Sequence, residues 1–162
     1  MRKIVLLCCN VIVGITIAVA GCPALATPPT VPAKFLVRIG GFLGPSYSVE
    51  LADNVLVYGK VKAGVLVEPT KIRPSPEQWN AFRVSLDNIG AWKWQSTYYA
   101  SDVRDGTAWL VDIEYADRKL SSAGSNSYPG LSGAPSRDVG YTKEFEAYLS
   151  AVETLIGNRP FR

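Results

Sequence analysis

The sequence predicts an α+β domain of two layers, in which an antiparallel sheet of hairpins carries two amphipathic helices on one face. Short segments with an apolar residue at every second position follow one another across turn residues, with no helix between them. Two longer segments instead have apolar residues at helical spacing, one in the middle of the chain and one near its end. The expected order of elements is therefore strands, helix, strands, helix.

The residues before this domain are typical of an exported protein. Arg2 and Lys3 precede an apolar run that extends to Ala20, which is the pattern of a signal peptide. The run ends in Val-Ala-Gly-Cys, which resembles the lipobox of bacterial lipoproteins, where the cysteine receives the lipid and becomes the new N-terminus. We predict a signal peptide over residues 1–21, a lipid on Cys22 and a Pro-rich tether over residues 22–33. Cleavage after Ala26 and an uncleaved membrane anchor are the alternatives.

The domain itself is predicted to span residues 34–162 and to begin with strands. Residues 35–39 form a short strand that is apolar except for Arg38, and residues 46–51 and 55–59 alternate on either side of a turn, so that the last two segments form a hairpin. A further strand is expected over residues 65–68. The region then ends at three prolines, because proline lacks the N–H group that a strand ladder needs: Pro69, Pro74 and Pro76.

The first helix has clear start and stop signals. Ser75 is the expected N-cap, with Gln78 completing a capping box, and Gly90 follows the last periodic residue. The expected core face consists of Trp79, Phe82, Leu86 and Ile89. The expected solvent face consists of Glu77, Asn80, Arg83, Asp87 and Asn88.

The second half of the domain contains the clearest strand, over residues 107–115, where Trp109 and three further apolar residues share one face. A turn near Asp117 leads to a strand over residues 120–123. Residues 124–140 are rich in Gly, Ser and Pro and are predicted to be a long functional or mobile loop. A helix from about Thr142 to Ile156 closes the domain.

Composition excludes several classes of function. The chain has no histidine, so it has no Ser-His or Cys-His nucleophile pair and no His-ligated metal, and we expect neither a metal nor a cofactor. Its 17 Lys and Arg against 14 Asp and Glu become 15 against 14 once Arg2 and Lys3 leave with the signal. This near neutrality predicts no nucleic-acid partner. Cys8 and Cys9 leave as well, so the domain is expected to fold without a disulfide.

An aromatic run is the strongest candidate for a binding surface. Trp92, Trp94, Tyr98 and Tyr99 lie within eight residues of one another, and exposed aromatic rings stack on sugars or accept side chains of a partner. We expect the nearby residues Ser125, Asn126 and Tyr128 of the long loop to join them. The alternative interpretation is that Trp92 and Trp94 cover one end of the core.

Four short patterns are similar to those of a family of small exported bacterial proteins that carry a domain of unknown function. They are Gly-Pro-Ser-Tyr-Ser-Val-Glu-Leu at residues 44–51, Pro-Ser-Pro-Glu-Gln-Trp at 74–79, Asp-Gly-x-x-Trp at 105–109 and Ser-Asn-Ser-Tyr-Pro at 125–129. They span most of the chain after the tether and consist of turn residues and core aromatics. The resemblance implies one exported domain and no particular activity.

Two classes of function follow. The first is a non-catalytic, lipid-anchored module of the cell envelope that binds a protein, a peptide or a glycan. The second is a carboxylate-dependent hydrolase or lyase of the envelope, in which residues such as Asp102 and Asp105 would do acid and base chemistry.

Overall fold

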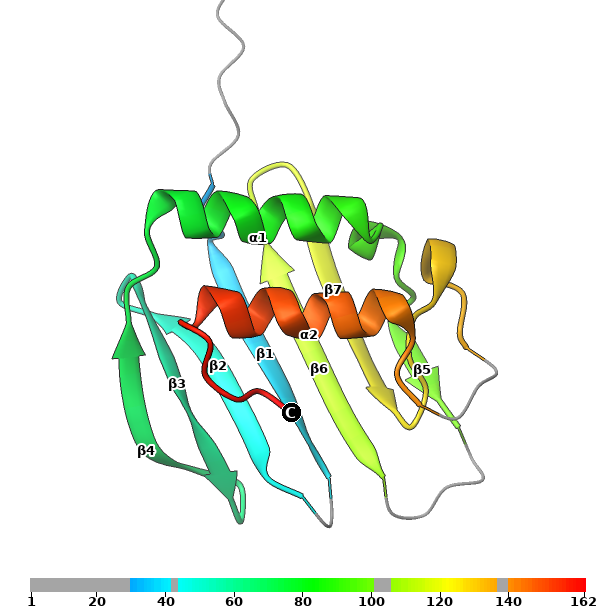
Figure 1. Cartoon of the computed structure of the whole chain (residues 1–162), viewed down its shortest axis with the longest axis horizontal. Coiled ribbons are helices and arrows are strands. Elements are labelled where there is room, and N and C mark those ends of the chain that lie inside the picture. Colours follow the sequence, from blue (N-terminus) through cyan, green and yellow to red (C-terminus); the bar gives the residue numbers. More distant parts are fainter. Residues whose placement is uncertain (1–29, 42–43, 101–105, 137–139) are drawn as a thin grey trace, which may run out of the picture.

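A computed structural model of the chain describes residues 30–41, 44–100, 106–136 and 140–162. The fold is α+β, with one seven-stranded mixed sheet and two helices (Figure 1). The strands lie side by side in the order β4-β3-β2-β1-β6-β7-β5. Their bounds are β1 Lys34–Gly41, β2 Ser46–Ala52, β3 Val55–Lys62, β4 Val65–Ile72, β5 Thr97–Tyr99, β6 Thr107–Glu114 and β7 Lys119–Ser125.

The prediction of a wholly antiparallel sheet is wrong at one edge. Neighbouring strands are antiparallel except β5, which pairs in parallel with β7. Figure 1 shows why: helix α1 (Pro76–Asn88) crosses from the β4 edge to the opposite edge, where β5 enters in the direction of β7. The order of elements also differs from the predicted one, because β5 and two short 3₁₀ helices, η1 (Ala91–Lys93) and η2 (Leu131–Gly133), interrupt it.

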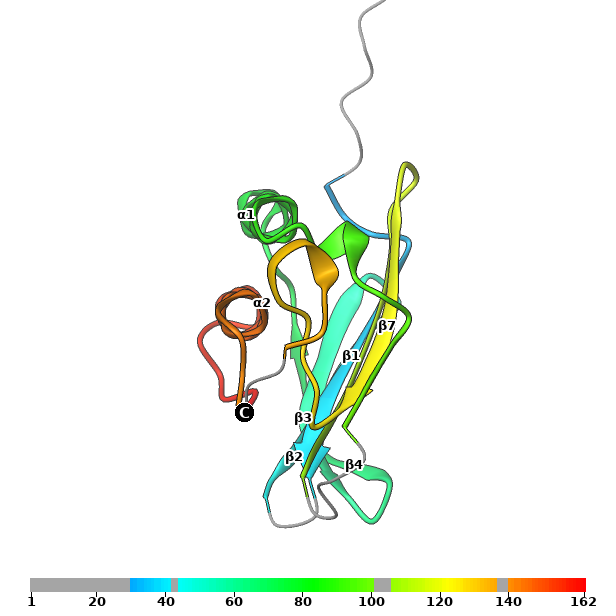
Figure 2. The same ribbon diagram turned by 90° about the vertical axis from the view of Figure 1, so that its right-hand side faces the viewer.

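The core lies between the sheet and the helices. Helices α1 and α2 (Lys143–Leu155) are on the same side of the sheet in Figure 2. Trp79 of α1 contacts Phe35 of β1 edge to face, with ring centroids 5.6 Å apart. On β6, Trp109 packs against Phe145 of α2 at 4.9 Å. Trp79 and Trp109 are each 4% exposed, which confirms their predicted place in the core.

The predicted helix ends are confirmed. Ser75 Oγ accepts a hydrogen bond from the Gln78 N–H at 3.3 Å, and Gln78 Oε1 accepts one from the Ser75 N–H at 2.8 Å, which completes the capping box. Thr142 caps α2 by accepting from the Phe145 N–H at 3.0 Å. Gly90 follows α1 with φ of +64°, a left-handed conformation that glycine adopts without steric cost.

Arg83 corrects the predicted solvent face of α1, because it is only 8% exposed. Its Nη2 donates to Asp117 Oδ2 at 2.5 Å, and its guanidinium lies 4.6 Å from the centroid of the Tyr115 ring. This hydrogen-bonded ion pair raises the pKa of Arg83 and lowers that of Asp117. A long cationic side chain can be buried where a carboxylate and an aromatic face replace its water.

Two further boundaries differ from the predictions. Strand β4 continues through Pro69 to Ile72. This is possible because β4 is an edge strand and its register with β3 shifts at this point. Residues 124–136 are not one long loop, since Gly124 and Ser125 belong to β7, residues 131–133 form η2, and Tyr128 packs on Phe145 at 4.8 Å. Residues 137–139 lie outside the described residues.

Candidate functional site

The predicted aromatic surface is divided between the core and the solvent. Trp94 is 7% exposed and Tyr98 is 1% exposed, whereas Tyr99 is 73% exposed and Trp92 is partly buried. The division follows from strand geometry, since Tyr98 and Tyr99 are consecutive residues of β5 and point to opposite faces of the sheet. A ligand at the surface can therefore reach Tyr99 and part of Trp92.

Trp94 and Tyr98 have packing partners on several elements. The Tyr98 hydroxyl donates to the Gly133 carbonyl at 2.5 Å and accepts from the Gln95 N–H at 2.9 Å. The Trp94 ring lies 6.1 Å from that of Trp109 and 5.4 Å from that of Tyr148. These contacts agree with the alternative interpretation of Trp94, in which it covers one end of the core.

Trp92 belongs to a cluster of charged and aromatic groups between α1 and the β6–β7 turn. Its indole N–H donates to Asp87 Oδ1 at 2.6 Å, and the guanidinium of Arg118 lies 5.3 Å from its ring. Arg118 also pairs with Asp87 at 2.7 Å and with Asp117 at 3.1 Å. These contacts hold α1 against the β6–β7 hairpin, so packing and hydrogen bonding account for the position of Trp92.

The remaining predicted site residues are distributed as follows. Tyr128 is buried, and Asn126 is partly buried with a positive φ of +54°. Ser125 is opposite Tyr99 in the parallel ladder, so these two residues share a face of the sheet. Cys22, Asp102 and Asp105 lie outside the described residues.

The face that carries Tyr99 is the one that the helices do not cover, and we call it the outer face (Figure 2). On β1 the buried residues Phe35, Val37 and Ile39 point toward the helices, so Leu36, Arg38 and Gly40 belong to the outer face. The register extends this face across the sheet, because Glu50 is opposite Leu36 and Ser48 is opposite Arg38.

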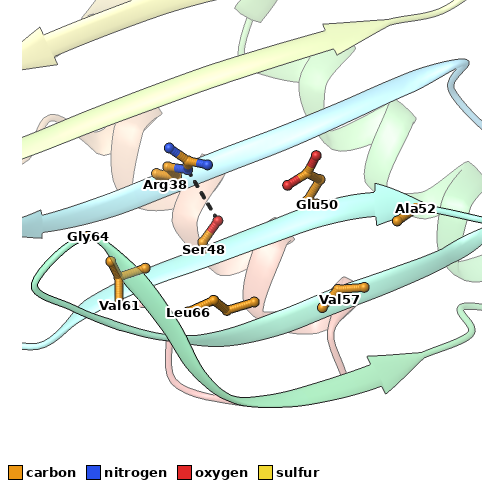
Figure 3. Close-up of a pocket in the computed structure, with 8 residues that line it drawn as sticks. All are labelled: Arg38, Ser48, Glu50, Ala52, Val57, Val61, Gly64 and Leu66. Carbon is orange, nitrogen blue, oxygen red and sulfur yellow. Dashed lines mark hydrogen bonds between the residues drawn. The ribbon is translucent and has the colours of Figure 1, made fainter.

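A groove of about 400 Å³ occupies the outer face over β1, β2 and β3 (Figure 3). Figure 3 views it from outside, with the helices behind the sheet, and shows Arg38 on β1 and Glu50 on the neighbouring strand β2. The apolar part of the lining consists of side chains from β2, β3 and β4, with Gly64 at the turn between β3 and β4. The lining residues are Arg38, Ser48, Glu50, Ala52, Val57, Val61, Gly64 and Leu66.

The wall of the groove depends on Gly59. The β3–β4 hairpin bends toward the outer face in Figure 2, and the register of its ladder shifts between Tyr58 and Lys60. A Cβ atom on Gly59 would lie 2.9 Å from the Val67 carbonyl oxygen and 3.0 Å from Leu66 Cδ1. The absence of a side chain therefore lets β4 approach β3 closely and brings Leu66 to the rim.

The two charged residues of the groove are not neutralised within the described part of the chain. Arg38 Nε donates to Ser48 Oγ at 3.3 Å, but neither Arg38 nor Glu50 forms an ion pair within 4.0 Å there.

On the outer face of β1, β6 and β7, four charged residues form ion pairs with one another. Lys34 pairs with Asp112 at 2.5 Å, and Lys119 pairs with Glu114 at 3.5 Å. The hydrogen bond with Asp112 raises the pKa of Lys34. The groove thus offers a cation and an anion to a ligand, whereas these four charged groups of β1, β6 and β7 pair with one another.

A second hollow of about 250 Å³ extends the groove toward β6. It shares Arg38 and Val61 with the groove, and it also touches Gly40 and Ala108. Ala108 is opposite Ser125 of β7, which in turn is opposite Tyr99 of β5. The exposed members of the predicted site and the groove are therefore connected along one face.

Sequence reasoning missed the groove because its residues come from several strands and no local pattern shows that they share one face. Two signals were present. Gly59 stands inside an otherwise regular strand, which indicates a bulge or a close backbone approach. Ala63-Gly64 stands between two apolar segments, as in a tight hairpin turn, and in the structure both residues have positive φ angles. Neither signal shows which strands the hairpin bends over.

Comparisons with protein families, curated proteins and solved structures find no match to this chain. Among the described residues, no helix combines the length and apolar character needed to cross a membrane. The same part of the chain contains no group of three or more acidic, Cys or His residues arranged to hold a metal ion.

Proposed function

We propose that this chain is a non-catalytic, lipid-anchored module of the bacterial cell envelope that binds a peptide segment of another envelope protein. The groove on the outer face is the observation that supports binding. In the proposed two-layer arrangement the helices bury one face of the sheet and leave the other free. Val57, Val61 and Leu66 remain partly exposed on the free face, where a partner would remove them from water.

The lining favours a peptide over a glycan as the ligand. Sugar rings are usually held by flat aromatic side chains, and the groove contains aliphatic and charged residues instead. Aliphatic pockets next to a few fixed polar groups suit the side chains of an extended peptide.

The proposed attachment rests on the segment that precedes the domain. Val-Ala-Gly-Cys at residues 19–22 would place a lipid on Cys22, and two acyl chains give stable membrane attachment where one does not. Residues 22–33 contain four prolines, which favour an extended conformation of about 3.1 Å per residue. Such a tether would reach about 37 Å from the membrane.

Cell fractionation tests the anchor. We expect wild-type protein in the membrane fraction with a mature N-terminus at Cys22, and we expect Cys22→Ala to lose this processing and its lipid. If the wild-type protein keeps Met1, or if the variant is processed and retained as fully as wild type, the lipid anchor is excluded. Mass spectrometry of the purified N-terminal peptide distinguishes these results.

Site-specific photo-cross-linking tests the binding surface. A photoreactive residue replaces Val57 in the groove, and a matched control replaces Val84, which is 46% exposed on α1. We expect the Val57 probe to join one defined peptide segment, and a synthetic copy of that segment to bind the purified protein. An adduct pattern equal to that of the Val84 control would remove the groove as the binding surface.

A further inference from the structure

We infer that the groove recognises an extended peptide in which a basic, an acidic and an aliphatic residue occupy every second position. This inference rests on the proposed function and names the chemistry of its ligand. It follows from the order in which Glu50, Arg38 and the aliphatic pair Val61 and Leu66 occur along the strands.

The register places these groups in three successive rows across the outer face. The first row contains Glu50, opposite Leu36 on one side and Val57 on the other. The second row contains Arg38 and Ser48, which are also opposite each other. The third row contains Val61, opposite Ser46 and Leu66.

The row spacing matches an extended peptide. Successive rows on one face of a sheet are two residues apart, which corresponds to about 6.6–6.8 Å along the strand. An extended peptide that runs parallel to the strands presents alternate side chains to the sheet with the same repeat. A basic residue would then face Glu50, an acidic residue would face Arg38, and an aliphatic residue would face Val61 and Leu66.

Charge complementarity explains why both charges stay without an ion pair in this part of the sheet. Arg38 donates its Nε–H to the neutral Ser48 hydroxyl, at 3.3 Å. The Nη groups are then available for a two-point contact with a carboxylate, which guanidinium geometry favours. Figure 3 shows the Glu50 carboxylate on the same side of the sheet as Arg38.

The concave shape favours one segment over a second copy of this chain. Two sheets that pack face to face interdigitate the side chains of their inner faces at a separation of about 10 Å, so nothing can stand between them. Here the β3–β4 hairpin bends toward the outer face (Figure 2), and Leu66 of β4 lines the groove. A single extended segment fits beside that hairpin, whereas a second sheet would be held away from Arg38 and Glu50.

Binding of short labelled peptides to the full-length chain, purified in detergent, tests the inference. The first probe is the heptapeptide Thr-Lys-Thr-Glu-Thr-Leu-Thr with both ends blocked, and the second exchanges its Lys and Glu. Each is also made in the reverse order, because the chain direction of the ligand is not specified by the rows. Fluorescence anisotropy gives the dissociation constants.

We expect the first pattern, in one chain direction, to bind about tenfold more tightly than the exchanged pattern, which corresponds to one well-formed charged contact. Arg38→Glu should remove this preference. The double variant Arg38→Glu with Glu50→Arg should reverse it, so that the exchanged peptide binds more tightly. Lys143→Glu, a charge reversal at an exposed position of α2, should leave the affinity for both peptides unchanged.

Three results would overturn the inference. One is binding of none of the four peptides at millimolar concentration. Another is equal binding of both patterns with no reversal in the double variant. The third is a wild-type dimer in light scattering that Arg38→Glu converts to a monomer, because a second copy would then occupy the groove. If the Val57 cross-link still identifies a bound segment, the proposed function stands and only the charge pattern is wrong.

Discussion

Tyr98 and Tyr99 offer a direct test of how the sheet divides core from surface, because they are consecutive residues on opposite faces of β5. We predict that Tyr98→Ala strongly destabilises the domain and that Tyr99→Ala leaves its stability almost unchanged. The two substitutions remove the same atoms from neighbouring positions. Tyr99→Ala is therefore a matched control for the loss of a tyrosine ring.

The expected magnitudes follow from the contacts of each ring. Tyr98 is 1% exposed, lies 5.7 Å from the Trp109 ring and makes two hydrogen bonds through its hydroxyl. Tyr98→Phe keeps the ring but leaves the Gln95 N–H and the Gly133 carbonyl without that partner, which costs about 1–2 kcal/mol. Tyr98→Ala also creates a cavity and should cost about 3–5 kcal/mol. Tyr99→Ala should stay within about 0.5 kcal/mol.

Urea unfolding followed by far-ultraviolet circular dichroism measures these differences in the free energy of unfolding. Thermal unfolding gives an independent estimate, since 1 kcal/mol corresponds to roughly 3–6 °C in a domain of about 130 residues. The expected order of midpoints is wild type and Tyr99→Ala together, then Tyr98→Phe, then Tyr98→Ala.

One result would refute this reasoning. If Tyr98→Ala unfolds at the same urea concentration as Tyr99→Ala, the Tyr98 ring is not part of the core and its two hydrogen bonds contribute nothing. An exposed platform made of both tyrosines would give this result. In the structure only Tyr99 is exposed, so only Tyr99→Ala should leave the free energy of unfolding unchanged.

Three further predictions concern the core, the groove wall and alkaline pH. Trp79→Ala should lower the free energy of unfolding by about 3–5 kcal/mol in urea, with or without reductant, because the ring fills the core against Phe35. Gly59→Val should lower the thermal midpoint and weaken peptide binding, because its Cβ would approach the Val67 carbonyl at 2.9 Å; unchanged values of both would show that β4 does not lie that close. Burial raises the pKa of the Tyr115 and Tyr148 phenols above the unfolded value of about 10. Their contribution to stability is therefore full below pH of about 10 and is lost as the pH rises through the pKa values of the folded state. The urea midpoint should fall over that range, and it should fall less in Tyr148→Phe, which lacks one of the two phenols.

Local patterns in the sequence were enough to determine the helix ends and the core positions of Trp79 and Trp109. Ser75 and Gln78 satisfy the first N–H groups of α1 with atoms that lie within one helical turn. Trp79 and Trp109 occupy positions whose spacing alone places them on an apolar face. These features depend on neighbouring residues, which is why the amino-acid order reveals them.

The tertiary structure decided which groups meet and which face stays open. Arg83 is buried because Asp117, 34 residues away, lies across from it, and no local pattern indicates that distance. The parallel pairing of β5 depends on the route of α1 across the sheet. Residues 124–136 fold onto the core through Tyr128 and η2, although their Gly and Ser content is typical of a loop.

The candidate site is the clearest case of this second kind. Arg38, Glu50 and Leu66 come from three different strands, and no local pattern in the sequence connects them. Only strand pairing and the bend at Gly59 bring them around one groove. A periodic pattern indicates which residues share one side of a strand. Long-range packing determines whether that side is buried, is exposed to solvent or lines a groove.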